Sequence, residues 1–130
     1  MQYLTDEELQ LASRFLFLSM AIIVIEQDIQ LVKEGVFKIK RPYLALLESM
    51  MTRATNERKK LRKKMKEKRI QIVTHHKNES FTSYLFICQG KEEERNYFNP
   101  VIQKKVEEII LELLQTTTIQ YDHPSFHEAF

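Results

Sequence analysis

The basic segment, residues 53–69, holds the side chains of this sequence that are best suited to chemistry with phosphates. It carries ten cations against the two carboxylates of Glu57 and Glu67, so its formal charge is +8. Lysine and arginine side chains neutralise nucleic-acid phosphates and release the counterions condensed on them. One hypothesis is therefore a nucleic-acid surface made by Arg53, Arg58, Lys59, Lys60, Arg62, Lys63, Lys64, Lys66, Lys68 and Arg69.

The favoured interpretation is that these cations form the solvated side of an amphipathic helix. The whole chain carries +2, so the residues outside the basic segment carry −6 and could supply counter-charge within a monomer or across a dimer. The candidate acids are Glu92, Glu93, Glu94, Glu107, Glu108 and Glu112. Only Thr55 and Asn56 lie nearby as readers of base edges. Nucleic-acid contact by this helix would then be electrostatic and poor in sequence information.

Signatures of an enzyme are missing from the sequence. With two glycines, the chain has no Gly-rich phosphate loop and no G-x-S-x-G elbow, and it has no H-E-x-x-H pattern. Its carboxylates come in runs, which more often solvate a surface than perform acid–base catalysis. We predict no catalytic residue, no cofactor and no enzyme activity.

The histidines do not form a metal-binding pattern. His75 and His76 are neighbours in an expected strand, and adjacent strand residues point to opposite faces. His123 and His127 would align only in a helical tail, and a tetrahedral zinc ion would need further ligands that nothing specifies. We predict no metal site.

The single cysteine and the apolar run point to the cytoplasm. Cys88 cannot form a disulfide within the chain and lies in an apolar stretch, so we expect a buried thiol that packs as a small hydrophobic residue. The N-terminus has no cationic leader region. The apolar run of residues 15–25 is shorter than the roughly 20 residues of a membrane span. We expect a cytoplasmic protein with no membrane contact.

Two long helices are expected in the first half of the chain. Thr5 and Glu8 form a capping-box pattern, and Gly35 is a stop signal, so the first helix is predicted over residues 6–34. The second begins near Pro42, ends near 68–70 and contains the basic segment. Apolar residues recur along it in alternating steps of three and four, broken once by Arg58: Leu44, Leu47, Met51, Ala54, Leu61 and Met65.

A β-hairpin and a third helix are expected in the second half. Alternating, β-branched residues predict strands on either side of a turn at residues 77–80. Residues 91–98 either continue the second strand after a bend or form a third strand. Asn99 as N-cap and Pro100 at the first position predict the start of a helix, which the threonine triplet at residues 116–118 ends. The predicted fold is a mostly helical α+β domain over 1–115, with a flexible or partner-docking tail over 116–130.

Two features of the helices predict a homodimer. The first helix is apolar on all sides between residues 15 and 25, and the apolar positions of the second have the 3.5-residue spacing of paired helices. The interface residues expected are Phe15, Leu18, Ile22, Leu47, Met51, Leu61 and Met65.

Two stretches of the chain resemble a family of small uncharacterised proteins from Bacillus and related Firmicutes, the YhjD-like family. The first is an FK-x-K-x-PYL connector, made here by Phe37, Lys38, Lys40, Pro42, Tyr43 and Leu44. The second leads from an aromatic strand through a glycine to Y-x-NP, with Tyr84, Phe86, Gly90, Tyr97, Asn99 and Pro100. The resemblance covers about residues 5–115 and implies a bacterial cytosolic origin. It carries over no functional residue.

Two functions from different classes remain. The first is a non-enzymatic interaction or regulatory protein that self-associates through its helices and could bind another protein. The second is a nucleic-acid binder using the basic segment and the hairpin, since a helix pair followed by a hairpin resembles part of a winged-helix layout.

Overall fold

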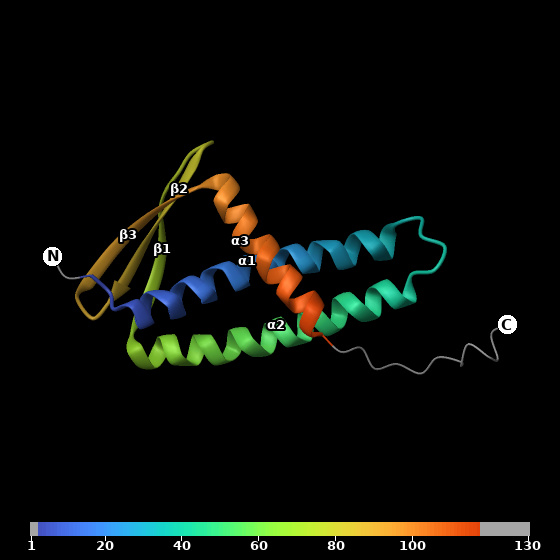
Figure 1. The fold of residues 1–130 in the computed structure, drawn as a ribbon, viewed down its shortest axis with the longest axis horizontal. Coiled ribbons are helices and arrows are strands. Elements are labelled where there is room, and N and C mark those ends of the chain that lie inside the picture. Colours follow the sequence, from blue (N-terminus) through green and yellow to red (C-terminus); the bar gives the residue numbers. More distant parts are fainter. Residues whose placement is uncertain (1–2, 118–130) are drawn as a thin grey trace.

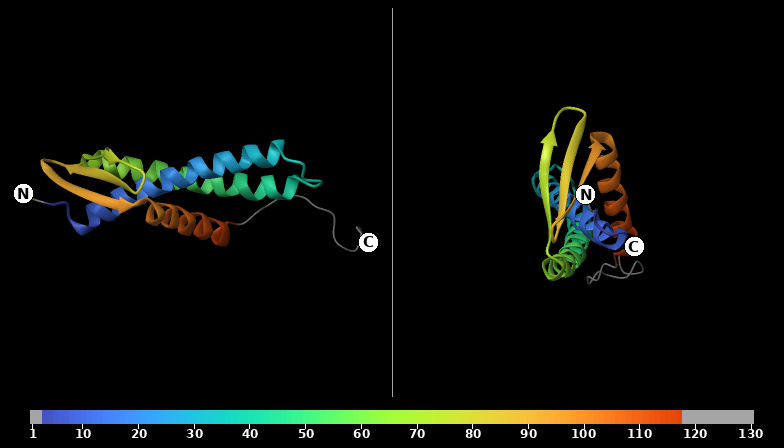
Figure 2. Two further views of the ribbon diagram at one scale, coloured as in Figure 1. Left: turned by 90° about the horizontal axis from the view of Figure 1, so that it is seen from above. Right: turned by 90° about the vertical axis from the view of Figure 1, so that its left-hand side faces the viewer.

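The computed structural model describes residues 3–117 and shows three helices and one sheet (Figure 1). In chain order the elements are α1 (Asp6–Glu34), α2 (Arg41–Lys68), β1 (Ile70–Lys77), β2 (Phe81–Cys88), β3 (Lys91–Phe98) and α3 (Asn99–Thr116). Helices α1 and α2 lie antiparallel along the length of the molecule, the sheet covers one end of this pair, and α3 crosses it (Figures 1 and 2). The predicted α+β class is confirmed.

Helix α1 begins and ends where its sequence signals predict. The Thr5 hydroxyl accepts a hydrogen bond from the Glu8 amide at 3.2 Å, and the Glu8 carboxylate accepts one from the Thr5 amide at 2.8 Å. This is the predicted capping box, which satisfies two backbone donors at the helix start. By length and composition alone, α1 could span a membrane, and 28% of its most apolar window is buried inside the molecule.

Helix α2 is one unbroken helix from Arg41 to Lys68, as predicted. It ends at Arg69, which adopts the left-handed conformation at φ 56° and so turns the chain into β1. Its most buried residues are Met50, Ala54 and Met65. Leu47, Met51 and Leu61 of the predicted apolar seam are half-buried against the core.

The predicted hairpin of β1 and β2 is confirmed and gains a third antiparallel strand, in the order β1-β2-β3. Residues 91–98 therefore form a strand rather than a continuation of β2. The reversal before β3 uses Gln89 and Gly90, both at positive φ, 48° and 82°. Phe86 and Cys88 of the central strand are fully buried against the helices.

Helix α3 begins one residue earlier than predicted, and Asn99 is not its cap. Asn99 is the first helical residue, Phe98 precedes it, and no side chain caps the helix. The Asn99 amide instead donates to the carbonyl oxygens of Asn78 and Glu79 and accepts from the Thr82 hydroxyl at 2.7 Å. The Asn99 side chain therefore holds the β1–β2 turn against the start of α3.

Helix α1 lies between two apolar clusters. One unites Leu18, Ala21 and Ile25 with residues of α2 and α3, and the other unites Ala12 with Met65 and the buried face of β2. These contacts cover most of the apolar middle of α1 with neighbours from the same chain, and Ile23 is the residue of 15–25 that stays exposed. The predicted tail from 118 onward, with His123 and His127, lies outside the described residues.

Candidate functional site

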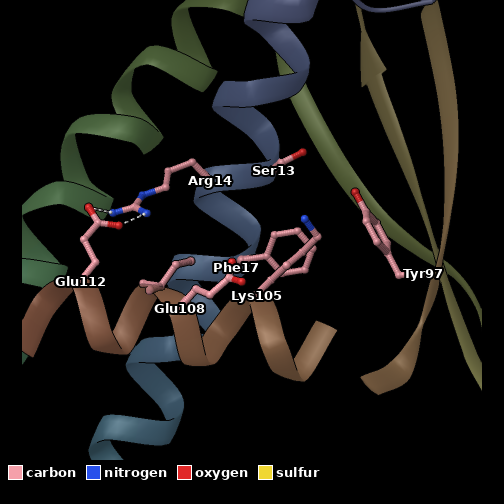
Figure 3. A pocket seen from close by; sticks show the side chains of 8 residues that line it. Ser13, Arg14, Phe17, Tyr97, Lys105, Glu108 and Glu112 are labelled. Atoms are coloured by element: carbon pink, nitrogen blue, oxygen red, sulfur yellow. Dashed lines mark hydrogen bonds and ion pairs between the residues drawn. The ribbon is translucent and has the colours of Figure 1, made fainter. Parts of the chain in front are cut away.

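One hollow of about 260 Å³ lies where α1, α3 and β3 meet (Figure 3). The side chains that line it are Ser13, Arg14, Phe17, Tyr97, Lys105, Glu108, Ile109 and Glu112. Aromatic rings form one wall, because Phe17 and Tyr97 meet edge to face with centroids 5.4 Å apart. Burial raises the pKa of the Tyr97 hydroxyl, which disfavours its use as a base.

Arg14 in this hollow joins three helices. Its guanidinium donates two hydrogen bonds to Glu57 of α2, at 2.7 and 3.0 Å, and two to Glu112 of α3, at 3.0 and 3.3 Å. These bonds raise the pKa of Arg14 and lower that of Glu57. Two bidentate carboxylates occupy most donors of the guanidinium, so this group stabilises the helix junction and has little capacity left for an anionic ligand.

Arg58, the one break in the apolar seam of α2, faces α1 rather than solvent. Its Nε donates to the Ser19 hydroxyl at 2.8 Å, and its guanidinium lies 4.7 Å from the centre of the Phe15 ring. The cation therefore stacks on an aromatic face and binds a hydroxyl, which makes its half-buried position favourable. The position of Arg58 within the apolar seam was the sequence signal for this packing role. Because its guanidinium is already engaged, Arg58 is not free to bind a phosphate.

The basic segment divides into cations with partners in the chain and cations without one. Besides Arg58, Arg53 donates to the carbonyl oxygen of Thr116 at 3.1 Å, and Lys68 lies 3.5 Å from Glu7. Among the described residues, the remaining seven form no ion pair and all are exposed: Lys59, Lys60, Arg62, Lys63, Lys64, Lys66 and Arg69.

The acids expected to neutralise the basic segment within the monomer do not do so. Glu112 binds Arg14, Glu93 binds Arg95 at 2.6 Å, and Glu94 accepts from Ser83 at 2.8 Å. In the described chain, no ion pair links the six predicted acids to a cation of the basic segment. Neutralisation across a dimer stays a prediction.

A shallow groove runs between the C-terminal half of α2 and β1. Its walls are Phe15, Arg58, Arg62, Met65 and residues 70–73. Arg62 at its edge is exposed, as is Gln71 on the strand. The groove thus places a free guanidinium and an amide beside an apolar floor.

The two neighbouring histidines correct the sequence interpretation. A β-bulge between Thr74 and His76 leaves His75 without a partner on β2. The two imidazole rings therefore stack, with centroids 4.3 Å apart, instead of pointing to opposite faces. Within residues 3–117, no group of three or more His, Cys, Asp or Glu side chains could hold a metal ion.

Cys88 has the buried environment predicted for it. Its side chain is 0% exposed, and its thiol donates toward Glu8 at 3.4 Å and the carbonyl oxygen of Lys68 at 3.3 Å. Burial, with the Glu8 carboxylate beside it, raises the pKa of the thiol. The thiol is thereby kept protonated and unreactive.

The residues predicted for a dimer interface lie mostly inside the single chain. Leu18 is 0% and Met65 6% exposed, and both are buried against the chain's own elements. Phe15, Ile22, Leu47, Met51 and Leu61 are half-buried at the edges of the two apolar clusters. The apolar side chains that α1 exposes are instead Ile23 and Leu31, at 54% and 64%.

Comparisons with known proteins agree with the resemblance seen in the sequence. The sequence model of the YhjD family, described as YhjD protein, matches residues 3–118. A protein of Bacillus subtilis (strain 168), named "Uncharacterized protein YhjD", is 34% identical over 110 residues, which are 85% of this chain and 92% of that protein. No solved structure gives a significant match.

Proposed function

We propose, for a chain that belongs to the YhjD family, a non-enzymatic function in which the basic segment binds a polyanion, with nucleic acid as the best-fitting class. One observation carries the proposal: seven exposed cations of the segment have no carboxylate partner among the described residues. Cations that only solvated a surface in an otherwise acidic chain would be expected to find acids. Of the six candidate acids, Glu93, Glu94 and Glu112 bind other groups, and among the described residues none pairs with the segment.

The chemistry of the surface supports phosphate contact rather than base reading. Lys59, Lys63 and Lys66 lie on the outer side of α2, opposite the buried Ala54, because steps of four and three residues follow one helix face. Lysine is a point charge that contacts phosphates without specifying a sequence. The groove beside β1 adds Arg62 and Gln71 at its rim. We therefore propose binding that is strong at low salt and tolerant of sequence.

The test is binding of fluorescent generic duplex DNA and RNA at ~50 mM salt, followed by a salt titration. The triple variant K59Q/K63Q/K66Q is expected to bind at least tenfold more weakly and to reduce the salt slope by about one per lost phosphate contact. The matched control K38Q/K77Q/K104Q removes the same charge from exposed lysines outside the basic segment and should bind as the parent does. Absence of binding by the parent at ~50 mM salt would refute the proposal.

Self-association is the second candidate, favoured by the exposed apolar face of α1. Ile23 and Leu31 are eight residues apart and therefore share one side of the helix, with Gln27 between them. A second copy seated there would cover side chains that are 54% and 64% exposed in the single chain. Such a dimer could serve an interaction or regulatory role, with or without a polyanion.

A further inference from the structure

The helical tip, residues 33–43, ends the α1–α2 pair at the pole of the molecule farthest from the sheet (Figures 1 and 2). Its connector exposes large apolar side chains to a degree unusual for a turn. Val36 is 103% exposed, Ile39 65%, Tyr43 54% and Phe37 51%. Val36 and Ile39 are the most exposed of the four, whereas Phe37 and Tyr43 also line an apolar groove.

Close packing beneath the connector fixes how these side chains are presented. A Cβ atom at Gly35 would lie 2.8 Å from the carbonyl oxygen of Leu31 and 2.9 Å from the Phe37 ring, so only glycine allows this approach. The Phe37 ring also meets Tyr43, with centroids 5.9 Å apart, above an apolar groove that includes Leu47. The Phe37 ring is therefore held in place by packing, and Val36 and Ile39 are the most exposed apolar side chains of the helical tip.

Cations alternate with the apolar side chains of the helical tip. Residues 33–43 hold Lys33, Lys38, Lys40 and Arg41 against the single acid Glu34, so the tip carries +3. The Lys40 ammonium donates to the carbonyl oxygen of Lys33 at 2.7 Å and holds the ends of the two helices together. Lys33 and Lys38 are exposed, both lie within three residues of Val36 in the chain, and Lys38 directly precedes Ile39.

From this arrangement we infer that the helical tip docks on the surface of an anionic lipid bilayer, with Val36 and Ile39 entering the headgroup region and the lysines contacting lipid phosphates. Apolar side chains that enter an interface together with flanking cations bind membranes by adding area burial to electrostatic attraction. A bilayer also needs no matching cavity to cover exposed side chains at the end of the helix pair. A second copy is disfavoured as the occupant because two tips of +3 would repel each other.

This inference is separate from polyanion binding by the basic segment. The two surfaces lie at different places on α2, since the helical tip includes its first turn and the basic segment its C-terminal half. It also differs from a membrane span, because α1 stays packed between its apolar clusters. Variants of each surface can therefore separate the two functions.

The first experiment is flotation of the full chain with vesicles of phosphatidylcholine alone or with ~30% phosphatidylglycerol. We expect binding to the anionic vesicles that falls at least tenfold in V36S/I39S and roughly tenfold in K33Q/K38Q. The variant K60Q/K64Q, which removes charge from the basic segment, is compared with the tip variants. Two controls make matched changes outside both surfaces: V73S/L111S removes exposed apolar groups from β1 and α3, and K77Q/K104Q removes two charges from exposed lysines. Both controls should bind as the parent does.

The second experiment reports insertion directly. The chain contains no tryptophan, so V36W introduces a single probe at the tip and L111W one at an exposed site on α3. Anionic vesicles should shift the emission of V36W to shorter wavelength and leave L111W unchanged. No binding to anionic vesicles, binding that depends on K60Q/K64Q but not on the tip variants, or a V36W shift caused by protein concentration alone would overturn the inference. The last result would assign the tip to a second copy.

Discussion

The Glu8 carboxylate joins α1 to the sheet as well as closing its capping box. It accepts hydrogen bonds from the Thr5 amide at 2.8 Å, from Lys91 of β3 at 2.6 Å and from the Cys88 thiol of β2 at 3.4 Å. These bonds favour the ionised form, Lys91 most strongly, and lower the pKa of Glu8 to about 2. A single side chain therefore links the start of α1 to the two residues, Cys88 and Lys91, that flank the β2–β3 turn.

The E8Q variant should lose stability in a pH-dependent way. Because the folded-state pKa lies below the unfolded value, ionised Glu8 stabilises the fold fully above about pH 4.5, and this contribution is lost as the pH falls toward about 2. We expect E8Q to lower the free energy of unfolding by about 1–2 kcal/mol at pH 7, a value reduced by solvent screening. Urea unfolding between pH 7 and pH 2 measures the difference, which should shrink over that range.

The neighbouring variant E7Q is the control for this experiment. Glu7 has an 81% exposed side chain that lies 3.5 Å from Lys68, so its loss should change stability little. A deficit of E8Q that stays constant down to pH 2 would show that shape, and not charge, is what Glu8 contributes.

At the scale of elements, α2 shows how a heptad-like pattern locates a buried side to within about one residue. The seam predicted from the sequence runs through Met51, but Met50 is the more deeply buried, at 2% exposure, and Met51 is half-buried. Helix α2 meets both α1 and α3, so its buried face is wider than the narrow stripe of a two-helix pair. The departure from the predicted seam is local to Met50, since Ala54 and Met65 on the seam are 0% and 6% exposed.

Alanine substitutions at these two methionines test that register. M50A should lower the free energy of unfolding by about 2–4 kcal/mol, because it leaves a cavity in the closed core. M51A makes the same chemical change one residue along the same helix and should cost about half as much. Urea unfolding of both variants gives the comparison, and an equal or larger loss for M51A would place the core on the predicted seam after all.

At the scale of the whole molecule, charge and apolar surface are distributed unevenly. The basic segment has +8 and the helical tip +3, while the chain as a whole has only +2. The exposed apolar side chains of α1, Ile23 and Leu31, belong neither to the basic segment nor to the helical tip. Dimerisation, polyanion binding and lipid binding are therefore assigned to different residues and can be tested with separate variants.

Sedimentation velocity distinguishes the dimer from the monomer. If α1 pairs with a second copy through Ile23 and Leu31, the parent should sediment as a dimer of 15.6 kDa chains, and I23S/L31S should dissociate it. The exposure of both residues in the single chain leaves the monomer fold intact in this variant. A single species near 15.6 kDa at high protein concentration would contradict the dimer prediction.

The sequence by itself determined the family, the helices, the β1–β2 hairpin and the segregation of charge, because capping residues, turn residues and apolar periodicity act within a few residues. Tertiary structure decided what those patterns leave open: the pairing of β3, the hydrogen bonds of Asn99, the bulge that stacks His75 on His76, and the partners of Arg14 and Arg58. Each depends on how segments up to 98 positions apart approach one another, as Arg14 and Glu112 do. The free cations of the basic segment belong to this second group, since a lysine is unpaired only when the fold places the acids elsewhere.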